Sequence, residues 1–224
     1  MLKILVIADI HGEFEGFSRM IDRMKERDFD LLICPGDFTD IYNTPEGYSQ
    51  TDIAELILQK LLSMGKPVFC VPGNHEPYEI LELFDEYNVN VHGKVKKFKN
   101  IHFVGFGGAA TPFNTKFEPT EEEIKTTLEE KVKRIKGDFV LITHNPAFGT
   151  KLDMTERGEH VGSKAVREFI EKNKPLLAIS AHIHEARGED ILGKTTLFYP
   201  GAAYEGYCGI VEINKHVKCE IKKF

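Results

Sequence analysis

Five short segments of this sequence end in side chains of the kinds that bind metal ions. Each follows an apolar run, and together they hold two aspartates, an asparagine and several histidines: Asp9-Ile10-His11, Gly36-Asp37, Gly73-Asn74-His75-Glu76, Thr143-His144 and His182-Ile183-His184. Carboxylate, amide and imidazole donors without thiolate suit Mn, Fe, Zn, Ni or Co. One such segment alone is more typical of a turn or a surface pair, but all five in this order predict a metal site.

A single site requires these segments to meet, and the apolar runs before them indicate how they do so. In α/β proteins the loops after the strands lie along the carboxyl edge of the sheet, where sites form. In the Asp9-x-His11 and His182-x-His184 pairs the middle residue points away, so the flanking side chains can aim at one place. Two aspartates held close together repel each other, and a pair of divalent cations removes that cost.

The first half of the chain alternates apolar runs with amphipathic stretches of helical spacing. This alternation is typical of βαβ units and a largely parallel sheet. The expected strands cover residues 2–8, 30–34 and 67–71, and the expected helices cover residues 14–27, 53–64 and 78–87.

The second half predicts a hairpin, further helices and then strands alone. Lys99-Asn100 is the expected hairpin turn. The expected strands are 95–98, 101–105, 139–143, 176–180, 186–192, 195–199, 209–213 and 217–222, and the expected helices are 120–135 and 163–173. An all-strand end on an α/β chain suggests two stacked sheets with helices outside, built as a single domain over residues 1–224.

Composition and charge narrow the function classes. The chain has 224 residues, 42% of them hydrophobic, and a formal net charge of −6. That charge disfavours a protein that coats a nucleic acid polymer. The apolar run at the N-terminus is short and is followed at once by Asp9 and His11, so we expect a buried strand and no signal peptide. Four cysteines without a C-x-x-C pair indicate a reducing compartment, and no run is long enough to span a membrane. We therefore expect a cytoplasmic protein.

The series D-x-H, G-D-x-x-D, G-N-H-E, single His and H-x-H resembles the motifs of the calcineurin-like metallophosphoesterases. It runs from Asp9 to His184 and so covers most of the chain. The resemblance implies an α/β fold of two stacked mixed β-sheets flanked by helices, an α/β/β/α sandwich. It also implies two divalent metal ions. Among Mn, Fe, Zn, Ni and Co, we favour Mn. One departure is Ala181, which stands where the family commonly has Gly before H-x-H.

The resemblance also implies a role for each motif residue. Six ligands would divide between the two metals, with Asp9, His11 and His184 on the first and Asn74, His144 and His182 on the second. Asp37 would bridge the metals. His75 would lie beside the substrate as general acid or transition-state stabiliser, and Asp40 would orient it.

The implied activity is hydrolysis of a phosphodiester or a phosphomonoester by a hydroxide that bridges the two metals. Ile41 follows Asp40 where the family's Ser/Thr protein phosphatases carry Arg, which argues against that class and slightly favours a phosphodiesterase. The expected substrate is a small phosphorylated compound, with nucleotides among the candidates. A non-catalytic interaction scaffold of the same fold and a structural single-metal protein remain alternatives. The sequence leaves the oligomeric state open.

Long irregular stretches supply candidates for substrate contacts. They cover residues 39–51, 105–119 and 145–162, and loops of this length in a compact domain are often functional. The glycine-rich run after Gly105 is either a substrate loop or a crowded connection. Arg157, His160 and Arg187 are either phosphate or base contacts or solvated surface residues, and Gly201 is a candidate for close approach of the substrate.

Overall fold

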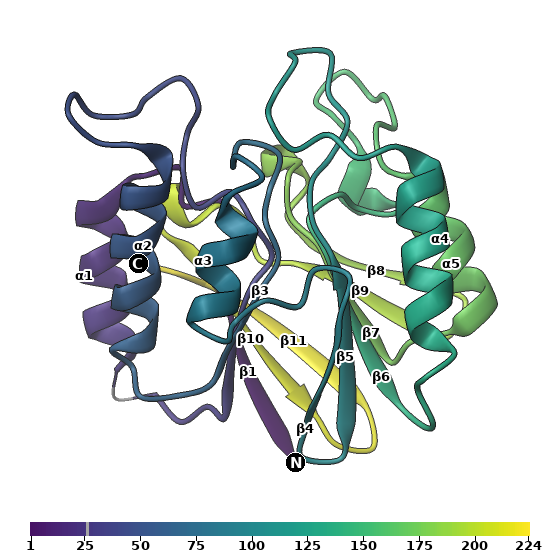
Figure 1. Ribbon diagram of the computed structural model, residues 1–224. Helices are drawn as coiled ribbons and strands as arrows, with labels where there is room; N and C mark the ends of the chain where they lie inside the picture. The colour runs from purple at the N-terminus through teal and green to yellow at the C-terminus, as the bar shows by residue number, and fades with distance from the viewer. Residues whose placement is uncertain (26) are drawn as a thin grey trace.

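The computed structural model describes residues 1–25 and 27–224. Within these residues the strands form two mixed sheets that stack face to face, with helices on both outer sides (Figure 1). This is the predicted α/β arrangement of two stacked sheets flanked by helices.

The first sheet joins strands from both ends of the chain, in the order β11-β10-β1-β2-β3. Its members are β1 (Leu2–Val6), β2 (Leu31–Cys34), β3 (Val68–Cys70), β10 (Tyr207–Ile213) and β11 (Val217–Lys223). The pairs β1–β2 and β2–β3 are parallel, whereas β10 pairs antiparallel with both β1 and β11. The helices α1 (Phe14–Met24), α2 (Gln50–Leu62) and α3 (Ile80–Glu86) flank this sheet (Figure 1).

The second sheet has the order β4-β5-β6-β7-β9-β8. Its members are β4 (Val95–Phe98), β5 (Ile101–Phe106), β6 (Phe139–Thr143), β7 (Leu177–Ile179), β8 (Gly188–Leu192) and β9 (Thr195–Tyr199). Strands β5, β6, β7 and β9 are parallel, and β4 and β8 close the edges in antiparallel pairs. The helices α4 (Glu121–Val132) and α5 (Lys164–Asn173) flank it.

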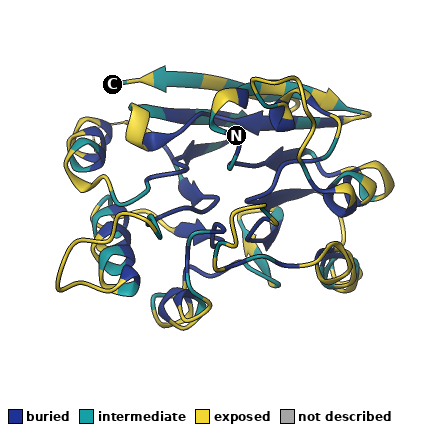
Figure 2. Ribbon diagram, turned by 90° about the horizontal axis from the view of Figure 1, so that it is seen from above, coloured by how far each residue is buried: buried dark blue, intermediate teal, exposed yellow. Residues whose placement is uncertain are grey.

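Apolar side chains fill three layers. Val6, Ile33, Phe103 and Val140 belong to a fully buried cluster drawn from strands of both sheets. Two further clusters join each sheet to its own helices. Figure 2, seen from above, shows the buried residues gathered in the strands and on the inner sides of the helices. The parallel strands are thereby fixed with their carboxyl ends along one edge.

Element boundaries follow local capping. Helix α2 begins three residues before the prediction because Ser49 and Asp52 form a capping box, and Thr120 caps α4 in the same way. The helix predicted over residues 14–27 ends at Met24, and residue 26 of that prediction lies outside the described residues. The strand predicted from residue 186 begins at Gly188.

Short 3₁₀ turns were absent from the sequence-based prediction: η1 (Lys151–Asp153), η2 (His184–Ala186) and η3 (Ala203–Glu205). The turn η2 is the reason that β8 starts late. None of the helices formed by residues 1–25 and 27–224 is long and apolar enough to cross a membrane.

Candidate metal centre

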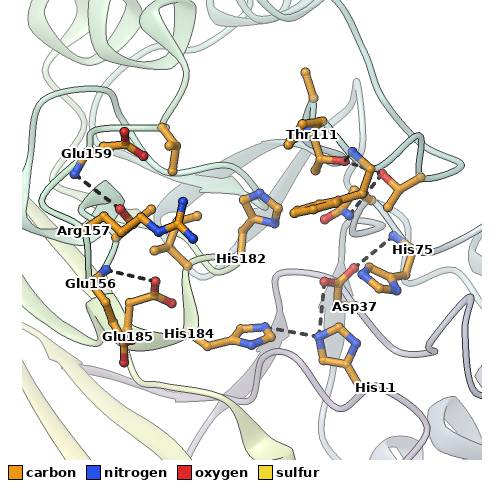
Figure 3. Close-up of a pocket in the computed structure, with 18 of the residues that line it drawn as sticks. His11, Asp37, His75, Thr111, Glu156, Arg157, Glu159, His182, His184 and Glu185 are labelled. Carbon is orange, nitrogen blue, oxygen red and sulfur yellow. Dashed lines mark hydrogen bonds and ion pairs between the residues drawn. The ribbon is translucent and has the colours of Figure 1, made fainter.

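The five predicted segments meet at the carboxyl edge of the two sheets. They follow strands β1, β2, β3, β6 and β7 in chain order, and they carry Asp9 and His11, Asp37, Asn74 and His75, His144, and His182 and His184. Figure 3 shows histidine and aspartate side chains from both sheets turned toward one another across a pocket. The sheet stacking therefore brings together the metal-type side chains of all five segments.

The first group of donors holds Asp9, His11, Asp37 and His184, whose ligand atoms all lie within 4.8 Å of one another. The Nε2 atoms of His11 and His184 are 3.2 Å apart, and His11 Nε2 lies 3.4 Å from Asp37 Oδ2. The Tyr199 hydroxyl donates to Asp9 Oδ2 at 2.6 Å and holds that carboxylate in place.

The second group holds Asp37, His144 and His182, again within 4.8 Å. His144 Nε2 lies 3.3 Å from the same Asp37 Oδ2 and 2.9 Å from Asn74 Oδ1. Asp37 thus belongs to both groups, and its Oδ2 atom lies between His11 and His144. The arrangement is that of two adjacent donor sets joined by one carboxylate.

The donor sets fit divalent cations. Two imidazole nitrogens that face each other at 3.2 Å can share only one proton when neutral, whereas a cation between such donors satisfies both lone pairs. Backbone strain accompanies this arrangement: Asp9, His11, Asp37 and His182 have φ of 52°, 50°, 53° and 79°. Non-glycine residues in this left-handed region cost about 1–3 kcal/mol each and cluster at functional sites.

The charged side chains of the site shift one another's pKa values. Burial raises the pKa of Asp37, but the attraction and hydrogen bond of His144 and the charge of His11 outweigh it and hold the pKa well below its usual range. Burial lowers the pKa of His144, yet Asp37 raises it to about 9. Burial, followed by repulsion from His144, lowers the pKa of His182 to about 3. Without metal, His144 therefore holds a proton that a cation would displace.

His75 lies beside both groups, with its ring centroid 4.8 Å from that of His11 in an edge-to-face contact. Its Nδ1 is 3.3 Å from Asp40 Oδ1 and also 3.3 Å from the backbone nitrogen of Ile41. A proton on Nδ1 favours the Asp40 contact, and a lone pair there favours the Ile41 N–H. Asp40 therefore lies against His75 Nδ1 in competition with a backbone donor, and its role in orienting His75 stays a prediction.

Glu76 was given no role by the sequence, although it ends the Gly73-Asn74-His75-Glu76 motif. It is fully buried, and its carboxylate accepts from the backbone nitrogens of Asp37 at 3.1 Å, Gly73 at 2.6 Å and Thr39 at 3.0 Å. Burial, and then the charge of Asp37, raises the pKa of Glu76 to about 7. Glu76 ties together the two loops that carry Asp37 and Asn74.

A cavity of about 560 Å³ opens over these groups. Loops 39–51, 105–119 and 145–162 all contribute to its lining, as their length suggested, and so does Arg157. The other two basic candidates have partners elsewhere: His160 Nδ1 lies 2.8 Å from Asp153, and Arg187 stacks on Tyr207 at 4.5 Å. A Cβ at Gly201 would come within 3.1 Å of the Arg187 and Tyr207 side chains, and the role of Gly201 in substrate approach stays a prediction.

Comparison with known proteins identifies the family. The sequence model of the family described as calcineurin-like phosphoesterase matches residues 2–186. The chain belongs to this family. Among relatives of this phosphoesterase, an uncharacterized protein of Methanocaldococcus jannaschii is 37% identical over 207 residues, which covers 89% of this chain and 88% of the relative.

A second relative and a solved structure are also similar to this chain. A Fibrobacter succinogenes protein named "Probable cyclic nucleotide phosphodiesterase" is 27% identical over 159 residues, which covers 65% of this chain and 57% of the relative. The crystal structure of a Thermus thermophilus protein superposes with a TM-score of 0.77 at 18% identity, over 99% of this chain and 98% of that one. That likeness shows the shared fold.

In this phosphoesterase the loop at residues 105–119 holds the Asn74 side chain. Asn74 Nδ2 donates to Thr115 Oγ1 at 3.2 Å, and Thr115 is held in turn by Glu118. The backbone nitrogens of Lys116 and Phe117 both donate to the backbone carbonyl oxygen of Asn74 at 3.0 Å. Because its amide nitrogen is engaged by Thr115, Asn74 turns its Oδ1 toward His144 and the donor group.

Replacement of Thr115 by Val should weaken metal binding at the second donor group. The change keeps the side-chain shape but leaves Asn74 Nδ2 without its acceptor, and loss of such a supporting contact costs about 10–100-fold in metal affinity. Calorimetric metal titration checks this, with Thr126→Val on the exposed face of α4 as the control. Equal affinity in Thr115→Val and the parent protein would refute the role of Thr115.

His92 anchors the start of the same loop, because its Nδ1 accepts from the Gly107 backbone nitrogen at 2.9 Å. Burial, and secondarily Lys94, lowers the pKa of His92 from 6.5 to about 4. The unfolded chain therefore takes up a proton on His92 near pH 6.5, whereas His92 in the folded protein stays neutral until about pH 4. The contribution of neutral His92 to the free energy of unfolding is thus present above pH 6.5 and is lost as the pH falls toward 4.

We expect His92 to account for about 2 kcal/mol of the unfolding free energy lost between about pH 7.5 and about pH 5. Urea unfolding of metal-free protein at both pH values measures this loss. His92→Asn keeps an acceptor for Gly107 without titrating, so it should lose correspondingly less stability on acidification. An identical loss in both proteins would contradict the prediction.

Proposed function

We propose that this calcineurin-like phosphoesterase is a dinuclear metal-dependent phosphoric ester hydrolase. The observation that carries the proposal is the shared position of Asp37, whose Oδ2 lies 3.4 Å from His11 Nε2 and 3.3 Å from His144 Nε2. A carboxylate between two sets of nitrogen and oxygen donors is the spacer that a pair of cations requires. Carboxylate, amide and imidazole donors suit Mn, Fe, Zn, Ni or Co, and among these we favour Mn as the first metal to test.

When bound, the metal pair would supply a hydroxide nucleophile at neutral pH and neutralise charge on the phosphoryl oxygens. The residues of the chain would position the metal pair and the reacting groups. Asp37 and Glu76 fix the spacing of the loops that carry the donors. His75 has its Nδ1 directed at Asp40 and Ile41, which leaves Nε2 to give a proton to the leaving oxygen.

We favour a phosphodiester over a phosphomonoester. Ile41 stands in the place of the arginine that the family's Ser/Thr protein phosphatases carry next to Asp40. The Fibrobacter relative named as a cyclic nucleotide phosphodiesterase supports the same class, and it makes nucleotides the first substrates to examine. A cavity of about 560 Å³ accommodates a ligand of that size.

Metal counting and turnover together test the proposal. Purified protein loaded with Mn should hold two ions per chain by elemental analysis. It should hydrolyse bis-p-nitrophenyl phosphate faster than p-nitrophenyl phosphate, and removal of the metal with a chelator should abolish both activities. One ion per chain would favour the structural single-metal alternative. No turnover of either ester with any divalent metal would favour the interaction scaffold.

A further inference from the structure

Two aromatic side chains from different loops stand exposed within the same cavity. Tyr42 has 68% of its surface exposed and Phe113 has 70%, and both line the cavity over the donor groups. The Tyr42 hydroxyl donates to the Phe113 carbonyl oxygen at 3.4 Å, so the two loops touch at this point. Large apolar side chains scattered singly on a surface are ordinary, but a pair that lines one pocket marks a binding surface.

The loops that carry this aromatic pair are held in place. Gln50 Nε2 donates to the His75 carbonyl oxygen at 2.8 Å, and Lys116 Nζ donates to Gln50 Oε1 at 2.6 Å. Gln50 therefore connects the loop of Phe113 to the segment that carries His75. The hydrogen bond between Lys116 and Gln50 thus connects the loops of the aromatic pair, and both rings remain exposed to a ligand.

Tyr42 lies next to the expected proton donor. Its ring is 5.8 Å from that of His75 in an edge-to-face contact, and its backbone nitrogen donates to Asp40 Oδ1 at 2.8 Å. If His75 serves the leaving oxygen, the group attached to that oxygen passes beside Tyr42. The opposite side of the cavity carries polar side chains, and Figure 3 shows Arg157 pointing across it toward His182.

From this geometry we infer that Tyr42 and Phe113 bind a planar aromatic group on the leaving side of the phosphoric ester. The substrate class would then be phosphoric esters of nucleosides, or of other alcohols that carry an aromatic group. This inference rests on the proposed function, because it assigns the leaving side from His75. Stacking on aromatic side chains tolerates every base, so the pair would select an aromatic group without selecting one base over another.

Binding of two phosphate compounds that differ only in the base tests the inference. Adenosine 5′-monophosphate and ribose 5-phosphate present the same phosphate to the Mn-loaded protein, and calorimetry compares their dissociation constants. We expect the nucleotide to bind about tenfold tighter or more. Tyr42→Ala and Phe113→Ala should each remove most of that difference, and Tyr42→Phe should keep it. Tyr48→Ala is the matched control, because Tyr48 is an exposed tyrosine of the same loop that lines a different hollow.

The outcomes separate this inference from the proposed function. Equal binding of the two compounds by a protein that hydrolyses bis-p-nitrophenyl phosphate would overturn the aromatic site alone. Failure of both compounds to bind would overturn it as well, and the turnover assay would then show whether the hydrolase proposal survives. An unchanged preference in both alanine variants would assign the base contact to other residues and would also overturn the inference.

Discussion

Asp37→Asn should lower the metal content from two ions per chain to one or fewer and reduce turnover by about 1,000-fold or more. Asp37 belongs to both donor groups, so its loss affects two sites at once. Asn has nearly the same shape but lacks the charge that holds His11 and His144 in place and keeps the pKa of His144 at about 9. A lost stabilisation of about 4 kcal/mol in the transition state corresponds to this factor.

Elemental analysis and steady-state kinetics measure the two effects together. Asp28→Asn, on the surface beside Lys3, is the control for a lost carboxylate. Thermal unfolding of the metal-free variant should show that it still folds, because the backbone of Asp37 keeps its bond to Glu76. Two tightly bound ions in Asp37→Asn would exclude a bridging role.

His75→Ala should retain both metals and lose about 100- to 10,000-fold in turnover of esters with alkyl leaving groups. The reason is that an alkoxide needs a proton as it departs, whereas p-nitrophenolate departs readily without one. The loss on p-nitrophenyl esters should therefore be clearly smaller. This contrast separates proton donation from a general electrostatic effect, which would reduce both reactions alike.

His216→Ala, in the exposed turn between β10 and β11, controls for loss of a histidine. Asp40→Asn should produce a weaker version of the His75 effect, since Asp40 acts through the His75 ring and Ile41 N–H can still hold Nδ1. Full activity of His75→Ala on alkyl esters would remove His75 from the mechanism.

Much of the fold could be predicted because its signals are local. The strands at 139–143 and 195–199 have the predicted bounds, and the hairpin around Lys99-Asn100 forms as expected. Apolar runs, turn residues and capping residues act within a few positions of one another, so one pass along the chain finds them. The same holds for the donor segments, each of which lies within a few residues of the end of its strand.

The supporting contacts of the site could not be predicted. Tyr199 and Asp9 are 190 positions apart, and Thr115 and Asn74 are 41 apart. No local pattern marks either pair, because the contacts exist only after both sheets have stacked. Glu76 was visible in its motif, yet its burial and its bonds to two loops were not.

The sequence alone determined the main helices and strands, the donor types and their order along the chain, since these depend on side-chain chemistry and short-range periodicity. The tertiary structure decided how the C-terminal strands divide, with β8 and β9 in one sheet and β10 and β11 in the other. It also decided the left-handed backbone at Asp9, His11, Asp37 and His182. Strand pairing and backbone strain depend on the packing of the whole chain, which overrides local preference wherever distant segments meet.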